Sequence, residues 1–168
     1  MVKKQLILAH DLGTTGNKAS LFDEHGLLLG NAFAGYNTNY PRPNWVEQNA
    51  ADWWQAVIDT TQQLLAETDT SPDAIAAVGF SGQMMGCLPV DKQGVPLRPC
   101  IIWADTRAQN QAAAMVTKLG AKRIYQTVGH PASPAYSAAK ILWIRDNQPA
   151  IYEESACFLQ PKDYVAYQ

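Results

Sequence analysis

The residues best suited to chemistry lie in a short turn near the N-terminus, between two strand-like segments. The turn and its flanks contain a carboxylate, two hydroxyls, two glycines and an ammonium: Asp11, Gly13, Thr14, Thr15, Gly16 and Lys18. Backbone N–H groups and hydroxyls in such a turn can hold phosphate oxygens, and a carboxylate can help to hold their Mg²⁺. The alternative is an ordinary hairpin turn, since Asp and Gly are common turn formers.

This turn is not a Walker-type phosphate loop, because no Gly-Lys-Ser/Thr sequence follows it to open a helix. The segments around it are apolar. The run from Leu6 to Leu8 predicts a buried strand, the segment 18–22 predicts a second strand, and 27–34 predicts a third. Short turns between the three favour an antiparallel meander.

The remaining chain alternates between helical and strand-like patterns. A helix is expected from about Asn49 to Glu67, with Trp53 and Trp54 on its apolar face. Further strands are predicted at 74–80, 87–90, 99–103 and 156–159, and further helices at 104–119, 121–128, 136–145 and from 161 onward. The mixture indicates an α/β domain.

Two other strand ends carry unusual groups. Ser81–Gly86 follows one predicted strand and Trp103–Arg107 follows another. Ligands of open α/β sheets bind at such ends, so we expect these segments to converge with the first turn around a pocket. Each has a structural alternative: Met84 and Met85 could fill core gaps, Trp103 could be core, and Asp105 could cap a helix.

Composition narrows the classes of partner. The chain has 168 residues and a net charge of −2, without a block of one sign, which argues against nucleic acid or an anionic membrane. No apolar run approaches membrane-spanning length. Three cysteines without metal-ligand spacing indicate reduced thiols in a cytoplasmic protein.

Several motifs, in this order, resemble the FGGY carbohydrate kinases and within them the xylulokinases. They are Asp11–Gly16, Asn44–Gln48, Trp53–Trp54, Gly82–Gly86, Ile102–Arg107, Ala139–Trp143 and Gln160–Tyr164. The resemblance implies a ribonuclease H-like, actin-like ATPase fold: a mixed sheet whose first three strands are antiparallel, flanked by helices. It also implies transfer of the γ-phosphoryl group of ATP to a sugar hydroxyl, with Mg²⁺.

The resemblance also implies roles for single residues. Thr14, Thr15 and Gly16, with Gly13, would contact the ATP phosphates. Lys18 would offset their charge, and Asp11 would help to place the metal ion. The residues that match the sugar site of the family are Gln83, Met84, Met85, Trp103 and Asp105.

The pair Met84–Met85 departs from the family pattern. Xylulokinases usually have Met-His there, and glycerol kinases have Arg-Glu, with a Tyr where Ala135 lies. Glycerol is therefore not the expected substrate. A ketose such as xylulose is expected, with another pentulose, a hexulose, a polyol or a sugar acid as alternatives.

The resemblance covers residues 1–168 as the N-terminal part of the first of two kinase domains. The catalytic aspartate of the family belongs to a later motif, expected beyond Gln168, and no Asp here matches it. We therefore expect a fragment without a catalytic base or second domain, inactive alone, whose partners are the C-terminal half and, through exposed sheet edge, a second copy. The alternative from another class is a non-catalytic actin-like domain for nucleotide sensing or assembly.

Overall fold

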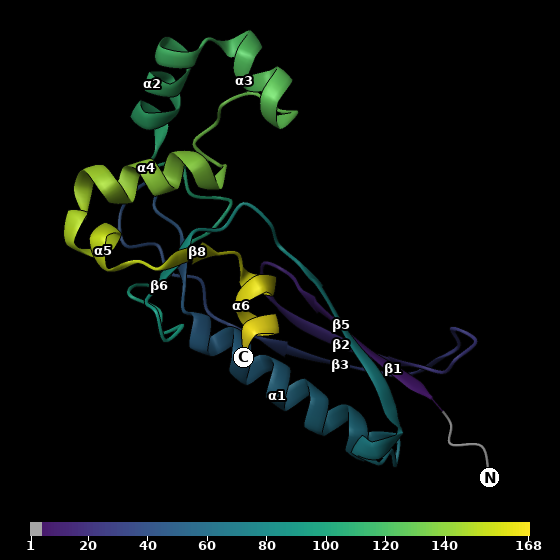
Figure 1. Ribbon diagram of the computed structural model, residues 1–168. Helices are drawn as coiled ribbons and strands as arrows, with labels where there is room; N and C mark the ends of the chain where they lie inside the picture. The colour runs from purple at the N-terminus through teal and green to yellow at the C-terminus, as the bar shows by residue number, and fades with distance from the viewer. Residues whose placement is uncertain (1–4) are drawn as a thin grey trace. The chain divides into compact units, whose positions relative to one another are not determined.

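The computed structural model describes residues 5–168, which divide into two compact units (Figure 1). Unit 1 comprises the residues up to 37 together with 51–83 and 161–168, and unit 2 comprises 38–50 and 84–160. Within the described residues, no helix has the length and apolar character needed to cross a membrane.

Unit 1 is built on a four-stranded mixed sheet. Its strands are β1 (Leu6–Leu12), β2 (Gly16–Phe22), β3 (Leu28–Gly35) and β5 (Ile75–Gly82), in the spatial order β3-β2-β1-β5. The first three strands pair antiparallel, whereas β1 and β5 pair parallel. The predicted mixed sheet with an antiparallel meander is therefore confirmed.

Alternation along β1 separates the core from the surface. Leu6, Leu8 and Leu12 are buried on one face, and Asp11 is exposed on the other. Helix α1 (Ala50–Glu67) covers the buried face and contributes Leu64 to the core. The short helices are η1 (Pro72–Ala74) and α6 (Pro161–Tyr167), and Tyr164 of α6 packs edge-on against the buried Trp53 at 6.4 Å between ring centroids.

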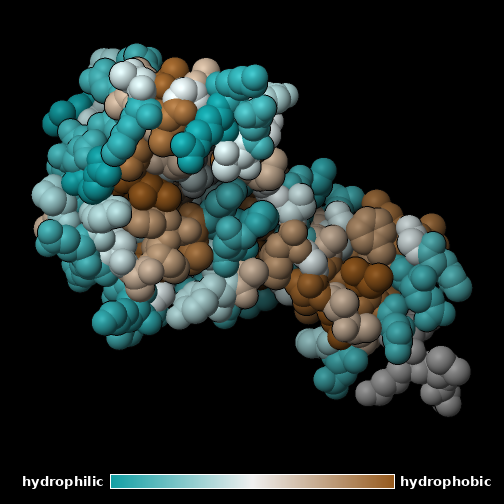
Figure 2. Space-filling model, turned by 45° about the horizontal axis from the view of Figure 1, so that its top comes forward, coloured by the Kyte–Doolittle hydropathy of each residue, from teal (hydrophilic) through white to brown (hydrophobic). Residues whose placement is uncertain are grey.

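Strand β5 differs from the sequence expectation. Its apolar run predicts a buried strand, but β5 is the edge strand of the sheet and most of its residues are exposed. Val78 is 50% exposed. Hydrophobic residues, brown in Figure 2, accordingly reach the surface of the described chain. Parallel strands are usually packed against other elements on both faces. The apolar composition of β5 therefore predicted more packing against the strand than the described residues provide.

Unit 2 contains two short antiparallel ribbons and four helices. Strand β4 (Glu47–Gln48) pairs with β7 (Cys100–Ile101), and β6 (Leu88–Val90) pairs with β8 (Cys157–Leu159). The helices are α2 (Gln109–Leu119), α3 (Ala121–Val128), α4 (Ser137–Asn147) and α5 (Pro149–Glu154). Sequence patterns did not predict α5, a single short helix that begins at Pro149, two residues after α4 ends.

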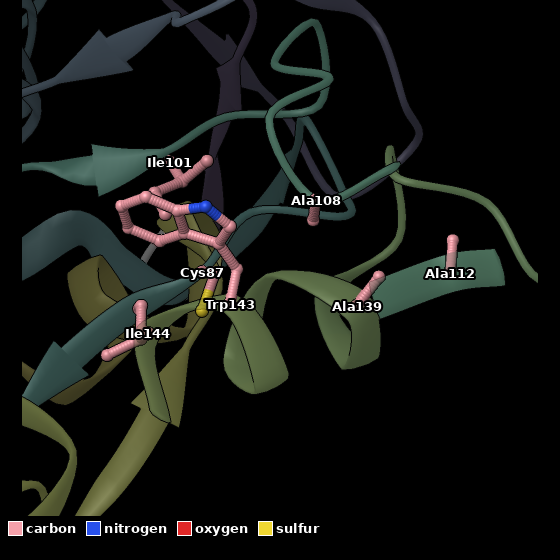
Figure 3. Packing of buried hydrophobic residues seen from close by; sticks show 7 residues of the cluster. All are labelled: Cys87, Ile101, Ala108, Ala112, Ala139, Trp143 and Ile144. Atoms are coloured by element: carbon pink, nitrogen blue, oxygen red, sulfur yellow. The ribbon is translucent and has the colours of Figure 1, made fainter. Parts of the chain in front are cut away.

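The core of unit 2 lies between these ribbons and helices (Figure 3). Trp143 and Ile144 of α4 pack with Cys87 and Ile101. Alanines line the approach of α2 to α4, and Figure 3 shows Ala112 beside Ala139. Small side chains at this contact let α2 and α4 approach closely. Packing against the core therefore determines the position of the first turn of α4.

A buried polar cluster joins the sheet of unit 1 to α1. Asn17 Nδ2 donates to His10 Nδ1 at 3.0 Å and to Thr60 Oγ1 at 2.8 Å, and all three side chains are buried. The ring of His10 also stacks on Phe80. Burial lowers the pKa of His10 below its usual 6.5, and only a neutral ring can accept the bond at Nδ1.

We predict that His10 makes the stability of the chain sensitive to acid. The unfolded chain binds a proton near pH 6.5 and the folded chain does not, so stability is lost as pH falls below 6.5. The free energy of unfolding should fall by up to about 1.4 kcal/mol per pH unit. Urea unfolding between pH 7 and pH 5 measures this, and His10→Gln should remove this component. The exposed-site control His25→Gln should keep it; equal pH profiles for both variants would contradict the assignment.

Candidate functional site

The turn between β1 and β2 is held from three directions within unit 1. The Gly13 N–H donates to the Asp11 carbonyl at 3.1 Å and to the Gly16 carbonyl at 3.0 Å. The Gly13 carbonyl accepts from the Tyr36 hydroxyl and, at 3.4 Å, from Gln83 Nε2. Burial and, secondarily, the charge of Asp11 raise the pKa of Tyr36, which keeps its hydroxyl a donor. The turn therefore has a defined shape.

Position 16 must be a glycine because there is no room for a side chain. A Cβ there would lie 2.5 Å from the Ala34 carbonyl oxygen and would overlap the Phe33 ring, both on β3. Neither Gly13 nor Gly16 has a positive φ, so permissive backbone conformation is not the reason for either residue. Close approach of β3 thus explains the second glycine of the motif.

Asp11 and Lys18 are cross-strand neighbours beside this turn. The β1–β2 register places them opposite each other, and both are exposed. Thr14 and Thr15 lie between the strands in the turn itself. A carboxylate, an ammonium and hydroxyls on one solvent-facing turn are a donor and acceptor set that fits a magnesium-bound phosphate chain.

The described residues contain no group of three or more His, Cys, Asp or Glu side chains that could hold a metal ion by themselves. An Mg²⁺ ion bound at Asp11 would therefore share its coordination with phosphate oxygens and water, which is the usual manner for this ion.

In unit 2, the segment Met84–Gly86 forms a second defined turn. Met85 has a φ of 65°, which is rare for a residue with a side chain. Its N–H donates to Gln160 Oε1 at 3.1 Å, and the hydroxyl of Ser137 donates to the Gly86 carbonyl at 2.8 Å. These bonds hold the turn and leave Met84 59% exposed.

Met84 and Met85 line a cavity of about 670 Å³. Apolar side chains of α2 and α3, including Leu119 and Ile124, form one wall. The loop before α4 and the start of that helix form another. The core alternative for Met84 is therefore wrong, because its side chain faces this space rather than filling it.

Trp103 and Asp105 follow β7 but lie in different environments. Trp103 is 42% exposed, so the core alternative is wrong for it as well. Asp105 is fully buried and accepts from the Val46 N–H at 2.6 Å and the Arg107 N–H at 2.9 Å. Asp105 is not a helix cap, because α2 begins at Gln109 after Ala108.

Arg107 completes a buried ion cluster with Asp105. Its Nη2 lies 2.6 Å from Asp105 Oδ2 and 2.7 Å from Glu47 Oε1, and Arg98 also pairs with Glu47. The guanidinium lies over the Trp45 ring at 3.7 Å. No sequence pattern indicated that Asp105 and Arg107 would turn toward each other and toward β4.

The structure thus forms two groups of predicted site residues. Asp11 to Lys18 and Gln83 come together in unit 1, since the Gln83 N–H also donates to the Leu12 carbonyl at 2.8 Å. Met84, Met85, Trp103 and Asp105 belong to unit 2. The convergence of all three strand ends stays a prediction.

Three residues that hold these groups in place were missed by sequence reasoning: Tyr36, Ser137 and Lys140. A lysine within an apolar helical pattern was a signal for the last of them. The catalytic base was expected beyond Gln168, outside the residues that the structure describes. A base beyond Gln168 therefore stays a prediction.

Comparisons with known proteins agree on one family. The FGGY family of carbohydrate kinases, N-terminal domain, matches residues 6–168. Glycerol kinase of Rippkaea orientalis is 36% identical over 152 residues, which cover 88% of this chain and 30% of that protein. Xylulose kinase of Klebsiella pneumoniae is 34% identical over 155 residues, which cover 92% of this chain and 31% of that protein.

The solved structures show the same likeness. A xyloylose kinase from Brucella ovis superposes with a TM-score of 0.91 at 34% identity, covering 96% of this chain and 34% of that one. The chain therefore spans about a third of the length of the relatives it matches.

We predict that Asp105 stabilises unit 2 strongly. Asp105→Ala removes one of the two carboxylates that pair with the buried Arg107 guanidinium. The free energy of unfolding should therefore fall by about 3–5 kcal/mol. The control Asp146→Ala removes an exposed pair with Arg145 and should cost less than about 1 kcal/mol. Urea unfolding compares the two. Equal small losses would contradict the structural role of Asp105.

Proposed function

The chain belongs to the FGGY family of carbohydrate kinases, and we propose that it supplies phosphate-binding and sugar-binding residues to an ATP-dependent, Mg²⁺-dependent sugar kinase. The observation that carries the proposal is the β1–β2 turn. Asp11 and Lys18 stand opposite each other and exposed, on a backbone fixed by Tyr36 and Gln83.

The phosphate side of the proposal follows from charge and geometry. Lys18 offsets the negative charge of the phosphates, and the backbone and hydroxyls of Thr14 and Thr15 hold their oxygens. Asp11 orients the Mg²⁺ ion, which when bound neutralises charge that develops during phosphoryl transfer. Positioning and charge neutralisation are most of what this reaction requires, and a fixed turn supplies both.

The sugar side of the proposal rests on unit 2. Met84 and Trp103 are exposed, and Met84 and Met85 line a cavity large enough for a small polyol. An indole face suits the apolar side of a sugar. Relatives include both glycerol and xylulose kinases. We favour a ketose such as xylulose over glycerol, because this chain has neither the Arg-Glu pair at 84–85 nor a Tyr at Ala135; other ketoses, polyols and sugar acids remain alternatives.

We further propose that this chain binds the ATP phosphates and the sugar, and that a longer protein performs the complete reaction. The relatives are about three times as long, and no Asp of this chain matches the general base of the family. In this proposal the base and the rest of the nucleotide pocket come from kinase segments beyond Gln168, with which this chain acts.

The direct test is ADP release with ATP and Mg²⁺ over a panel of ketoses, polyols and sugar acids. We expect turnover from the complete protein that contains this chain, highest with a ketose, and none from the 168 residues alone. Turnover by the 168 residues alone would contradict the proposal that the catalytic base and the rest of the nucleotide pocket come from other segments. Sugar-independent ATP hydrolysis with nucleotide-dependent filament formation would replace the kinase proposal with an actin-like assembly function.

A second test addresses the phosphate site. Lys18→Met should raise the KM for ATP roughly tenfold, because one charge-assisted contact to phosphate is lost, and should leave the KM for the sugar unchanged. The control Lys92→Met removes an exposed ammonium from unit 2 and should change neither. Steady-state kinetics measure both values. An unchanged KM for ATP in Lys18→Met would remove Lys18 from the phosphate site.

A further inference from the structure

Lys140 is a fully buried lysine in the first half of α4. Its Nζ donates to three backbone carbonyls: Met85 at 2.8 Å, Ile102 at 2.7 Å and Ala135 at 2.5 Å. An ammonium has three N–H groups, so these bonds use all of them. The charge of Asp105 acts on Lys140 only as a secondary influence.

Such a site is costly to maintain. Burial is the main cause that lowers the pKa of Lys140, to about 8, so the fold disfavours the charge that it encloses. A methionine of similar length would fill the same space without that cost. The free-energy cost of burying this ammonium is explained if the protein needs the three carbonyls to be held around one point.

The three carbonyls belong to segments that are far apart in the sequence but share one proposed role. Met85 lines the cavity and adopts a rare backbone conformation. Ile102 immediately precedes the exposed Trp103. Ala135 lies in the loop that precedes α4, between Ser133 and Tyr136, which both line the same cavity. One ammonium therefore joins the backbones of three sugar-site segments.

We propose that Lys140 is a positioning residue for the sugar site: its ammonium sets the relative placement of Met85, Trp103 and the loop that ends at Ala135. This inference rests on the proposed sugar-kinase function. Lys140 does not touch the sugar. It fixes the backbone from which the contacting side chains project, and a displacement of about 1 Å at such a site can cost about a hundredfold in rate.

The test compares two buried residues of the same helix. Lys140→Met removes the three donors and keeps the apolar stem, whereas the control Ile144→Ala removes core packing without touching the three carbonyls. In the complete protein, Lys140→Met should lower kcat/KM for the sugar by about ten- to a hundredfold and leave the KM for ATP unchanged. Ile144→Ala should lower stability but leave the KM for the sugar within about twofold.

A second variant, Lys140→Arg, keeps the test decisive if Lys140→Met does not fold. It keeps a cation and donors in the same place, but its planar fork cannot meet three carbonyls arranged around one point. Stability near that of the native protein with a lowered kcat/KM for the sugar supports positioning. A native kcat/KM for the sugar in either folded variant overturns it.

Amide hydrogen exchange separates failure of this inference from failure of the proposed function. In the complete protein, Lys140→Met should speed exchange together at Met85, Asp105 and Tyr136, and Ile144→Ala should not produce this joint change. These amides donate to Gln160 Oε1, to the Ile102 carbonyl and to the Ser133 carbonyl. If no sugar is phosphorylated by the native protein, the kinase proposal fails, and this exchange pattern alone decides whether Lys140 joins the three segments.

Discussion

Two of the buried cations in unit 2, Arg107 and Lys140, hold its loops in place. A charge removed from water must be met by hydrogen-bond acceptors or counter-charges, wherever in the sequence these lie. Arg107 finds Asp105 and Glu47, and its guanidinium lies over Trp45. Lys140 finds three carbonyls. Each cation adds side-chain bonds to segments that backbone pairing already brings near, since Glu47 pairs with Ile101 and Cys87 bridges to Ile101. The geometry of these loops therefore depends on satisfying the two cations as well as on the pairing.

Unit 1 reaches a defined site by another route. Its β1 strand buries alternate leucines and thereby directs Asp11 outward, while the antiparallel register brings Lys18 opposite. The turn between the strands is then fixed by Tyr36 and Gln83, which both donate to the Gly13 carbonyl. Regular pairing sets the positions of the charges, and two side chains set the shape of the backbone between them.

These two routes match the two parts of the proposed reaction. Phosphate binding depends on charge and backbone donors, which a hairpin can present with few residues. Sugar recognition depends on the relative placement of several loops, because small polyols differ only in the positions of their hydroxyl groups. A buried cation with several acceptors gives loops that placement, at the expense of stability.

The strands of the meander, most of the helices and the family to which the chain belongs could be predicted from the sequence alone. These follow from local patterns: apolar periodicity, turn residues and motifs in a fixed order. The sequence also indicated which residues could bind phosphate and sugar. The physical reason is that strands, turns and helices depend mainly on residues close in sequence.

The environments of the site residues depend on the tertiary fold and could not be predicted in this way. The fold placed Asp105 in a buried ion cluster, exposed Trp103, and made Gly16 necessary through the approach of Phe33 on β3. It also gave Lys140 its three carbonyls. Many of these partners lie tens of residues away in the sequence, as Met85 and Ile102 do from Lys140. No local pattern encodes which carbonyl will lie within about 3 Å of an ammonium.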